Sequence, residues 1–236
     1  MNSPTACQVT MTPQREWALL LILAGIQFTH ILDFMIMMPL GPQLTRAFAI
    51  SDAQFGLLVS AYTFAAGASG LLASLYIDRF ERRRLLLILY SLFAVATLAC
   101  GLAPTYETLM GARIAAGLFG GILSAMIQTI VADVVPFARR GKAMGVIMTS
   151  FSVSTVMGVP LGLYVAANSN WHTPFFGIAG ISFLLVVAGW YVIPTLQGHL
   201  HARGETGALQ GIGQVLSDPN HLLAFCFYIF IIIDGF

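Results

Sequence analysis

Long apolar stretches separated by short polar segments form the dominant pattern along this chain. A hydrocarbon core of about 30 Å requires about 20 apolar residues in a helix. Six stretches meet this length, at residues 17–40, 54–77, 85–103, 108–132, 144–167 and 174–194. A seventh begins near residue 221 and is still apolar where the sequence stops at Phe236. The pattern predicts an all-α membrane protein, a bundle of six transmembrane helices followed by a truncated seventh helix.

Basic residues are unevenly divided between the two ends of these predicted helices. Lys and Arg in short loops are retained on the cytoplasmic side during insertion. Nine of the 11 basic residues lie in the amino-terminal tail and in alternate loops, whereas Arg46 is alone in the opposite loops. We therefore expect a multi-pass protein of the inner or plasma membrane whose amino terminus is cytoplasmic.

The remaining segments complete the predicted organisation. Residues 1–16 are expected to form a cytoplasmic tail, 17–194 the six-helix bundle, 195–220 a glycine-rich cytoplasmic linker and 221–236 the start of the seventh helix. The first apolar stretch is too long for the apolar part of a signal peptide, so we expect it to remain in the mature protein.

The amino-acid composition agrees with a membrane protein and indicates which kinds of binding partner to expect. Hydrophobic residues make up 58% of the 236 residues and charged residues only 9%, with a formal net charge of +1. The lipid bilayer is therefore an expected partner, and there is no electrostatic reason to expect a nucleic acid. The three cysteines are far apart and form no metal-binding spacing, so neither a metal nor a cofactor is expected.

Six of the 21 charged residues are concentrated between Asp78 and Arg84, in a loop between two apolar stretches. This loop, from Ser74 to Arg84, resembles the G-x-x-x-D-R-x-G-R-R signature of the major facilitator superfamily, with Ser74 and Glu81 in place of two glycines. The superfamily's R-x-x-x-G motif resembles the stretch from Arg113 to Gly117.

Two further motifs are similar to those of a particular branch of the superfamily. Gly158-Val-Pro160-Leu-Gly162 is similar to the G-P-x-x-G motif of its antiporters, and Asp33 with Pro39 resembles the helix-one motif of the drug and sugar efflux branch. The resemblance implies the amino-terminal half of an arabinose-efflux-like proton antiporter, with a 3+3 arrangement of helices. It also implies protons, a small-molecule substrate and a second six-helix half as partners.

The charged loop has two interpretations. It can simply anchor the orientation of the chain, or it can form a charge-assisted network with a neighbouring helix end. The resemblance implies the second role, a cytoplasmic gate that is latched in the outward-facing state and formed by Asp78, Arg79, Arg82 and Arg83.

Charges inside the predicted spans are limited to Asp33, Arg113 and Asp234. Each costs a few kcal/mol at mid-bilayer, which makes an unneeded one improbable. At about 1.5 Å per residue, Asp33 is expected roughly 10 Å, and Arg113 roughly 9 Å, below the outer ends of their helices. We expect them to pair, with His30 one turn from Asp33, and to couple transport to protons; a static structural ion pair is the alternative. Asp234 has no nameable partner.

Small residues and a proline predict close helix contacts and a bend. Gly117 with Gly121 and Gly158 with Gly162 have the G-x-x-x-G spacing that allows helix backbones to approach closely in lipid, and packing alone explains them. Pro160 lacks a backbone donor and is expected to kink its helix.

Function is predicted as proton-coupled efflux of a small organic molecule, drug-like or a sugar, by alternating access. The alternative is a nontransporting membrane assembly protein or an inactive half-transporter fragment. An enzyme is not expected, because the sequence contains no HExxH, GxSxG or phosphate-loop motif. Five residues are expected to line an apolar cavity with a few polar points, although some must be ordinary lipid-facing or core side chains. They are Gln27, Phe64, Phe119, Gln128 and Phe151.

Overall fold

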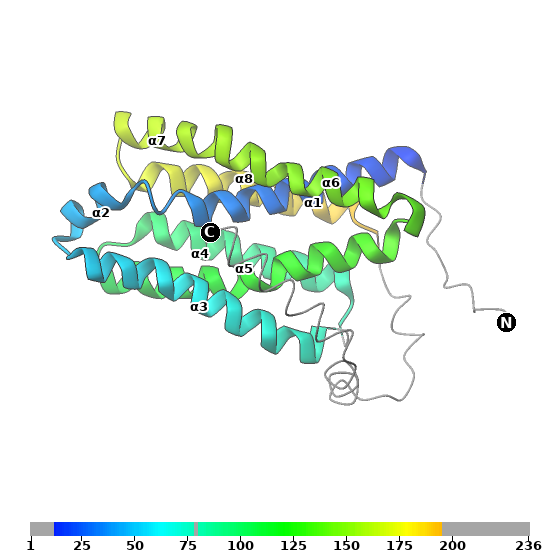
Figure 1. Ribbon diagram of the computed structural model, residues 1–236, viewed down its shortest axis with the longest axis horizontal. Coiled ribbons are helices and arrows are strands. Elements are labelled where there is room, and N and C mark those ends of the chain that lie inside the picture. The colour runs from blue at the N-terminus through cyan, green and yellow to red at the C-terminus, as the bar shows by residue number, and fades with distance from the viewer. Residues whose placement is uncertain (1–11, 78–79, 195–236) are drawn as a thin grey trace.

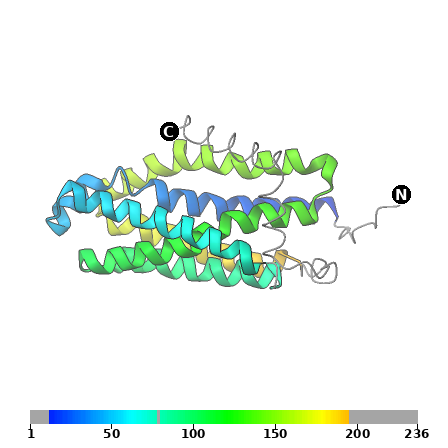
Figure 2. The same cartoon turned by 60° about the horizontal axis from the view of Figure 1, so that its bottom comes forward.

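The computed structural model describes residues 12–77 and 80–194 of the chain, which form an elongated bundle of helices lying along one axis (Figures 1 and 2). The helices are α1 (Pro13–Met35), α2 (Gly41–Phe48), α3 (Asp52–Tyr76), α4 (Arg82–Leu102), α5 (Tyr106–Val134), α6 (Phe137–Val153), α7 (Val159–Asn168) and α8 (His172–Val192). A π-helical turn, Ser154–Gly158, joins α6 to α7.

Six helical segments of the described part are long and apolar enough to cross a membrane. They are Pro13–Met35, Asp52–Ala73, Arg82–Leu102, Tyr106–Val134, Phe137–Asn168 and His172–Val192. The prediction of an all-α six-span bundle is confirmed. The tail before residue 12, the linker and the seventh stretch with Asp234 lie outside the described residues.

The first span differs from its predicted boundaries. Helix α1 begins at Pro13, before residue 17, and ends at Met35 rather than at residue 40. Turns follow it, and then the short helix α2, which the apolar pattern did not predict. Ile36, Met37 and Leu40 in these turns are fully buried. Burial explains why the segment is as apolar as a helix that spans the membrane.

The start of α3 illustrates how local sequence sets a helix boundary. Ser51 accepts a hydrogen bond from the backbone N–H of Gln54, while the Gln54 side chain accepts one from the backbone N–H of Ser51. This capping box satisfies two backbone donors that the first turn leaves free. Just before it, Ala49 ends α2 in the left-handed conformation, with φ of 51°.

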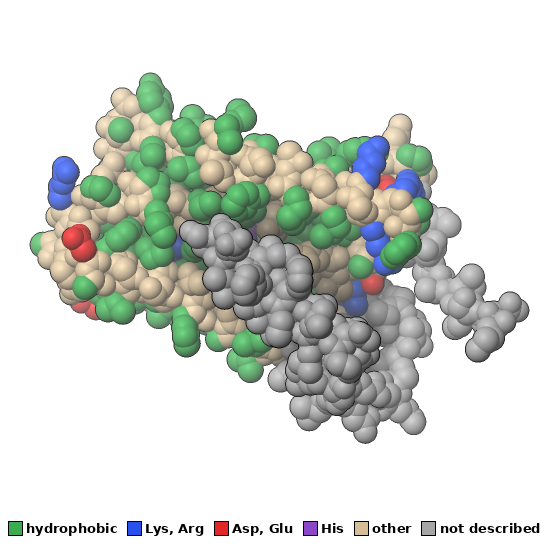
Figure 3. All heavy atoms as spheres, in the orientation of Figure 1, with side chains coloured by type: hydrophobic (Ala, Val, Ile, Leu, Met, Phe, Trp, Pro, Cys, Tyr) green, Lys and Arg blue, Asp and Glu red, His purple; other side chains and the backbone are tan. Residues whose placement is uncertain are grey.

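Buried side chains join the helices into one core. Tyr90 and Phe93 of α4 pack with Leu23 and Ile26 of α1 in a large apolar cluster. Other apolar side chains are exposed on the sides of the bundle, such as Phe64, which is 83% exposed. Figure 3 shows these apolar side chains spread along the bundle. An apolar perimeter of this kind is what lipid contact requires.

Charged side chains gather at the ends of the bundle (Figure 3). One end, called the basic end below, carries the starts of α1, α4 and α6 with their cluster of cationic residues. Its described members are Arg15, Arg82, Arg83, Arg84, Arg139, Arg140 and Lys142. Arg46 is in the last turn of α2, which lies at the opposite end of the bundle, at the left of Figure 1.

Candidate functional site

Asp33 of α1 and Arg113 of α5 form a buried ion pair. The Nη1 atom of Arg113 lies 2.8 Å from Oδ2 of Asp33 and donates a second hydrogen bond to the Asp33 backbone carbonyl at 3.3 Å. The Asp33 side chain is 0% exposed and that of Arg113 is 1% exposed. Each charge is therefore removed from solvent and lipid, and each neutralises the other.

Tyr62 of α3 covers the guanidinium of this pair. The Cζ atom of Arg113 lies 4.3 Å from the centroid of the Tyr62 ring, a cation–π contact, and Phe34 packs against the same ring at 5.5 Å. Three helices thus meet at the ion pair. The apolar pattern did not single out Tyr62, because a tyrosine within a span is not by itself unusual.

Several polar atoms around the ion pair have no hydrogen-bond partner among the described residues. They are Oδ1 of Asp33, Nε of Arg113, the hydroxyl of Tyr62 and both ring nitrogens of His30. The His30 ring lies 6.4 Å from the Tyr62 ring and 5.7 Å from Phe93. A partly satisfied network of this kind costs stability, which is a reason to expect a role beyond structure.

The absence of a side chain at Gly120 leaves space for the His30 ring in this cluster. A methyl group added at Gly120 would lie 2.7 Å from Nε2 of His30 and 2.9 Å from the Tyr62 hydroxyl. Any larger residue here would collide with both rings. The position of the His30 ring between α1, α3 and α5 therefore depends on a residue without a side chain.

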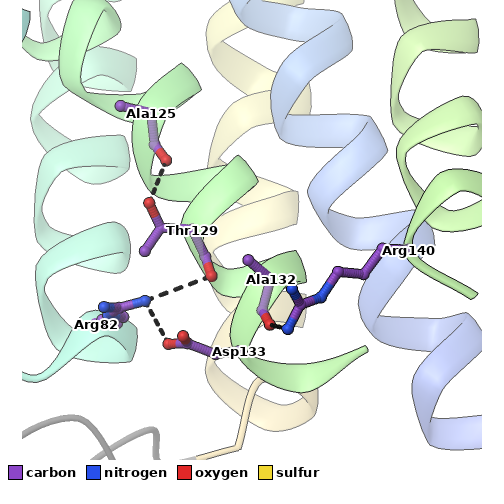
Figure 4. A network of polar contacts seen from close by, with 6 residues as sticks. All are labelled: Arg82, Ala125, Thr129, Ala132, Asp133 and Arg140. Carbon is purple, nitrogen blue, oxygen red and sulfur yellow. Dashed lines mark hydrogen bonds and ion pairs between the residues drawn. The ribbon is translucent and has the colours of Figure 1, made fainter. Parts of the chain in front are cut away.

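The basic end holds a second ion pair, between Arg82 of α4 and Asp133 of α5 (Figure 4). Arg82 also donates to the backbone carbonyl of Thr129 at 3.4 Å. Arg140 donates to the carbonyls of Ala132 and Val135, so that it caps the same end of α5. A cation at a helix carboxyl terminus also interacts favourably with the helix dipole.

The predicted gate residues are only partly within the described chain. Asp78 and Arg79 lie outside it. Arg82 contacts α5, whereas Arg83 turns to α8, where it donates to the backbone carbonyl of Trp190 and lies 5.6 Å from its ring. Asp133 was missed by the sequence reasoning. An acidic residue at the end of an apolar stretch, opposite a cluster of arginines, was the available signal.

The glycines of α5 lie where α3 approaches most closely. A methyl group added at Gly117 would meet the backbone carbonyl of Tyr62, and one added at Gly121 would meet that of Ala66. On the other side of the bundle, a methyl group added at Gly158 would lie 2.9 Å from the Leu32 side chain of α1. One added at Gly162 would meet the Ile36 side chain.

Pro160 follows the π-helical turn directly. The N–H of Val159 bonds to the carbonyl of Ser154, five residues earlier, instead of continuing the α-helical pattern. A proline clashes with the carbonyl four residues before it and donates no hydrogen bond. Widening the preceding turn accommodates that clash, and such π turns are frequent at functional sites.

The five residues expected to line a cavity are spread over the bundle. Phe64 and Phe151 are 83% and 50% exposed, and Gln128 is exposed, whereas Gln27 and Phe119 are partly buried. An apolar pocket of about 480 Å³ between α1, α7 and α8 is lined by none of them. Their common cavity stays a prediction. Among the residues that the structure describes, no three of His, Cys, Asp and Glu are grouped as metal ligands would be.

Six apolar spans, with an acid and a base paired in the core between them, are the features of an integral membrane protein. The chain belongs to the Major Facilitator Superfamily, whose family profile matches residues 23–236.

Curated relatives and solved structures agree with this family. The uncharacterized MFS-type transporter YhcA of Bacillus subtilis is 26% identical over 85% of this chain and 40% of that protein. A probable sugar efflux transporter of Helicobacter pylori is 26% identical over 75% of this chain and 44% of that protein. The proton:xylose symporter XylE has a TM-score of 0.73 and 17% identity, over 86% of this chain and 50% of that one. The chain therefore spans less than half the length of these curated relatives.

Proposed function

We propose that this chain is the amino-terminal half of a transporter that exports a small organic molecule in exchange for protons. The observation that carries the proposal is the ion pair of Asp33 and Arg113, buried between the first and fourth spans. Intramembrane ionisable residues are costly and usually serve the transport pathway.

The same pair supplies the chemistry for proton coupling. The protonation of Asp33 is set by two opposed influences, burial away from water and the adjacent guanidinium. A small movement of α1 against α5 changes their balance. In the proposed cycle Asp33 takes up a proton when the site faces outward and releases it to the cytoplasm, and His30 lies one turn away as a second proton carrier.

Two sources support efflux of a sugar or drug-like molecule. Several relatives carry the name probable sugar efflux transporter, and the helix-one motif around Asp33 and Pro39 resembles that branch. Efflux direction and substrate class are assigned to this chain as part of the proposal.

A second six-helix half is needed for the proposed mechanism. Alternating access moves two bundles against each other around a site near the middle of the membrane. The described chain supplies one bundle. The second bundle comes from further sequence, a second copy or a separate chain.

The basic end is proposed to face the cytoplasm. Its cationic cluster satisfies the rule that Lys and Arg in short loops stay inside. Asp78, Arg79, Arg82 and Arg83 are proposed to latch this side when the transporter faces outward, and the pair of Arg82 with Asp133 anchors that latch to α5.

Transport assays in lipid vesicles with an imposed pH gradient test the proposal. Vesicles containing the chain together with a second half should move radiolabelled sugar or a cationic dye against its gradient, and dissipating the pH gradient with a protonophore should stop this movement. Vesicles containing this chain alone should transport only if a second copy of it supplies the second half. Absence of transport with every candidate second half would favour a nontransporting assembly protein and contradict the proposal.

A further inference from the structure

A pocket of about 310 Å³ lies at the basic end, between the start of α4 and the end of α8. These two helices pack against each other. The pocket is lined by Glu81, Arg83, Arg84, Leu87, Ile88 and Trp190. None of these residues contacts the buried ion pair of Asp33 and Arg113, so the transport proposal does not explain the pocket.

The wall of the pocket changes from charged to apolar along the axis of α4. Arg83 and Arg84 are in the first turn of α4, and Leu87 and Ile88 follow four residues later on the same face. They are therefore about 6 Å deeper along the helix. The outer rim is thus charged, and the inner part is apolar.

The pocket opens to the surroundings of the bundle rather than to its core. The Arg84 side chain is 79% exposed, Trp190 is 61% exposed and Ile88 is 58% exposed. Trp190 is also near the end of its span, at the depth of the interface that tryptophan prefers. A molecule in this pocket would come from the lipid layer.

Charges on the rim favour an anion. The two guanidiniums and one carboxylate that line this pocket sum to a charge of +1. Arg84 pairs with Glu81 at 3.0 Å, whereas Arg83, among the described residues, donates to the Trp190 backbone carbonyl and lies against the Trp190 ring. The neighbouring Arg82 is already neutralised by Asp133. One anionic headgroup would balance the pocket, whereas a zwitterionic headgroup would leave it positive.

The carboxylate in the pocket adds a requirement for a hydrogen-bond donor. The Glu81 side chain is 9% exposed, and its Oε1 atom has no hydrogen-bond partner among the described residues. A headgroup that carries a hydroxyl beside its phosphate could donate to this oxygen. Free inorganic phosphate also carries P–OH donors at neutral pH, but it lacks the acyl chain that fills the apolar part.

We infer that this pocket is a binding site for an anionic phospholipid with a hydroxylated headgroup, such as phosphatidylglycerol. Its phosphodiester binds Arg83 and Arg84, its glycerol hydroxyl donates to Glu81, and its acyl chain lies along Leu87 and Ile88. Basic pockets between transmembrane helices bind anionic headgroups in this way. In the proposed orientation the lipid belongs to the cytoplasmic leaflet.

Lipid binding to the purified full chain in detergent tests this inference by native mass spectrometry and by lipid-dependent thermal unfolding. The probes are dioleoyl phosphatidylglycerol, the phosphatidylethanolamine and phosphatidylcholine with the same acyl chains, and inorganic phosphate. Phosphatidylglycerol should bind most tightly and raise the unfolding temperature, and inorganic phosphate should not displace it. Equal binding of all three lipids, or displacement by inorganic phosphate, would overturn the inference.

Charge-neutralising variants separate the pocket from the general positive charge of this end. Each basic residue near an anionic headgroup contributes about a factor of five in affinity, so R83Q/R84Q should weaken phosphatidylglycerol binding by about 30-fold. The control R139Q/K142Q removes the same charge from α6 at the same end and should leave binding within about twofold. Equal losses of phosphatidylglycerol affinity in the two variants would mean that the lipid responds to the overall positive charge of this end. That result would contradict a specific binding pocket.

A single variant guards against misfolding of the double variant. Arg84 is largely exposed, so R84Q should still fold and show a cooperative unfolding transition in the absence of lipid, although Glu81 loses its ion-pair partner. It should still bind phosphatidylglycerol about fivefold more weakly. Unchanged lipid binding by R84Q would remove this arginine from the site and overturn the proposed headgroup contact.

Discussion

Asp33 and Arg113 differ in how each can respond to the loss of its partner. An aspartate left alone in an apolar site can become neutral by taking up a proton, whereas an arginine remains charged at any accessible pH. Removing one member of a buried ion pair typically costs about 3–5 kcal/mol. The two single substitutions are therefore not equivalent tests of the pair.

We expect D33L to destabilise the bundle by about 3–5 kcal/mol, because it leaves an uncompensated guanidinium in the core. R113M should cost less, because Asp33 can then be protonated. The double variant D33L/R113M should regain most of the loss. Denaturant unfolding in micelles measures all three, and additive effects of the two substitutions would show that the ion pair does not couple them energetically.

Charge within an apolar stretch is the reason that sequence reasoning reached Asp33 and Arg113. Such residues are rare, and their depths in the membrane could be compared by counting along the helices. Tyr62 and Asp133 could not be reached in the same way. Their contacts with Arg113 and Arg82 depend on how α3, α4 and α5 are rotated about their axes, and one sequence contains little information on rotation.

Helix α5 shows how small residues determine the distance between two elements. Gly117 and Gly121 face backbone carbonyls of α3, whereas Gly111 on the same helix has no atom of a neighbouring element within 4 Å of an added methyl group. The three glycines therefore provide a comparison within one helix between a close contact and an open surface.

Substitution G117A or G121A should destabilise the bundle by about 1–3 kcal/mol, because the added methyl group forces α5 away from α3. The matched control G111A should be neutral or stabilise by up to about 1 kcal/mol, since alanine favours helix. Thermal unfolding in detergent is the measurement. A cost for G111A as large as that for G117A would mean that helix propensity rather than packing determines these values.

The π-helical turn before Pro160 gives the fifth span a place to bend. If α6 and α7 move against each other during transport, P160A should slow the exchange between the two facing states, because a regular helix becomes available. Spin-label distance measurements on a reconstituted pair of halves would follow this exchange. The control is P174A, because Pro174 is in the first turn of α8, where a proline costs no intrahelical hydrogen bond. Equal exchange rates in P160A and in the unsubstituted protein would show that Pro160 has no role in the conformational exchange.

Element lengths were predictable because membrane thickness fixes them, and all six spans were found. The end of the first span and the existence of α2 could not be predicted from hydropathy, because the turns between α1 and α2 are themselves buried and apolar. The π turn was also outside the reach of hydropathy. Pro160 indicated a bend, but only the backbone hydrogen bond from Val159 to Ser154 shows its form.

At the scale of the whole molecule, the two ends of the bundle differ in their number of basic residues, with a cationic cluster at the basic end and Arg46 of α2 at the other. This asymmetry is the basis for the proposed orientation, and it is a property of the whole chain rather than of any one loop.

Cysteine labelling tests the orientation. Cys7, Cys100 and Cys226 are first replaced by alanine, and one exposed position at each end is then changed, E107C at the end opposite the basic one and G141C at the basic end. A membrane-impermeant maleimide should label E107C in intact cells and should label G141C only after permeabilisation. The reverse pattern would place the basic end outside and invert the proposed direction of proton movement.

The most direct test of the account is the effect of a pH gradient on transport by D33N, with D52N as the matched control. Both variants remove one carboxylate, but Asp33 is buried at Arg113 whereas Asp52 is exposed at the start of α3. With a second half present in vesicles, D33N should insert normally and lose pH-driven substrate movement, while D52N should retain it. Movement by D33N that still depends on the pH gradient would contradict the assignment of Asp33 as the proton-coupling group.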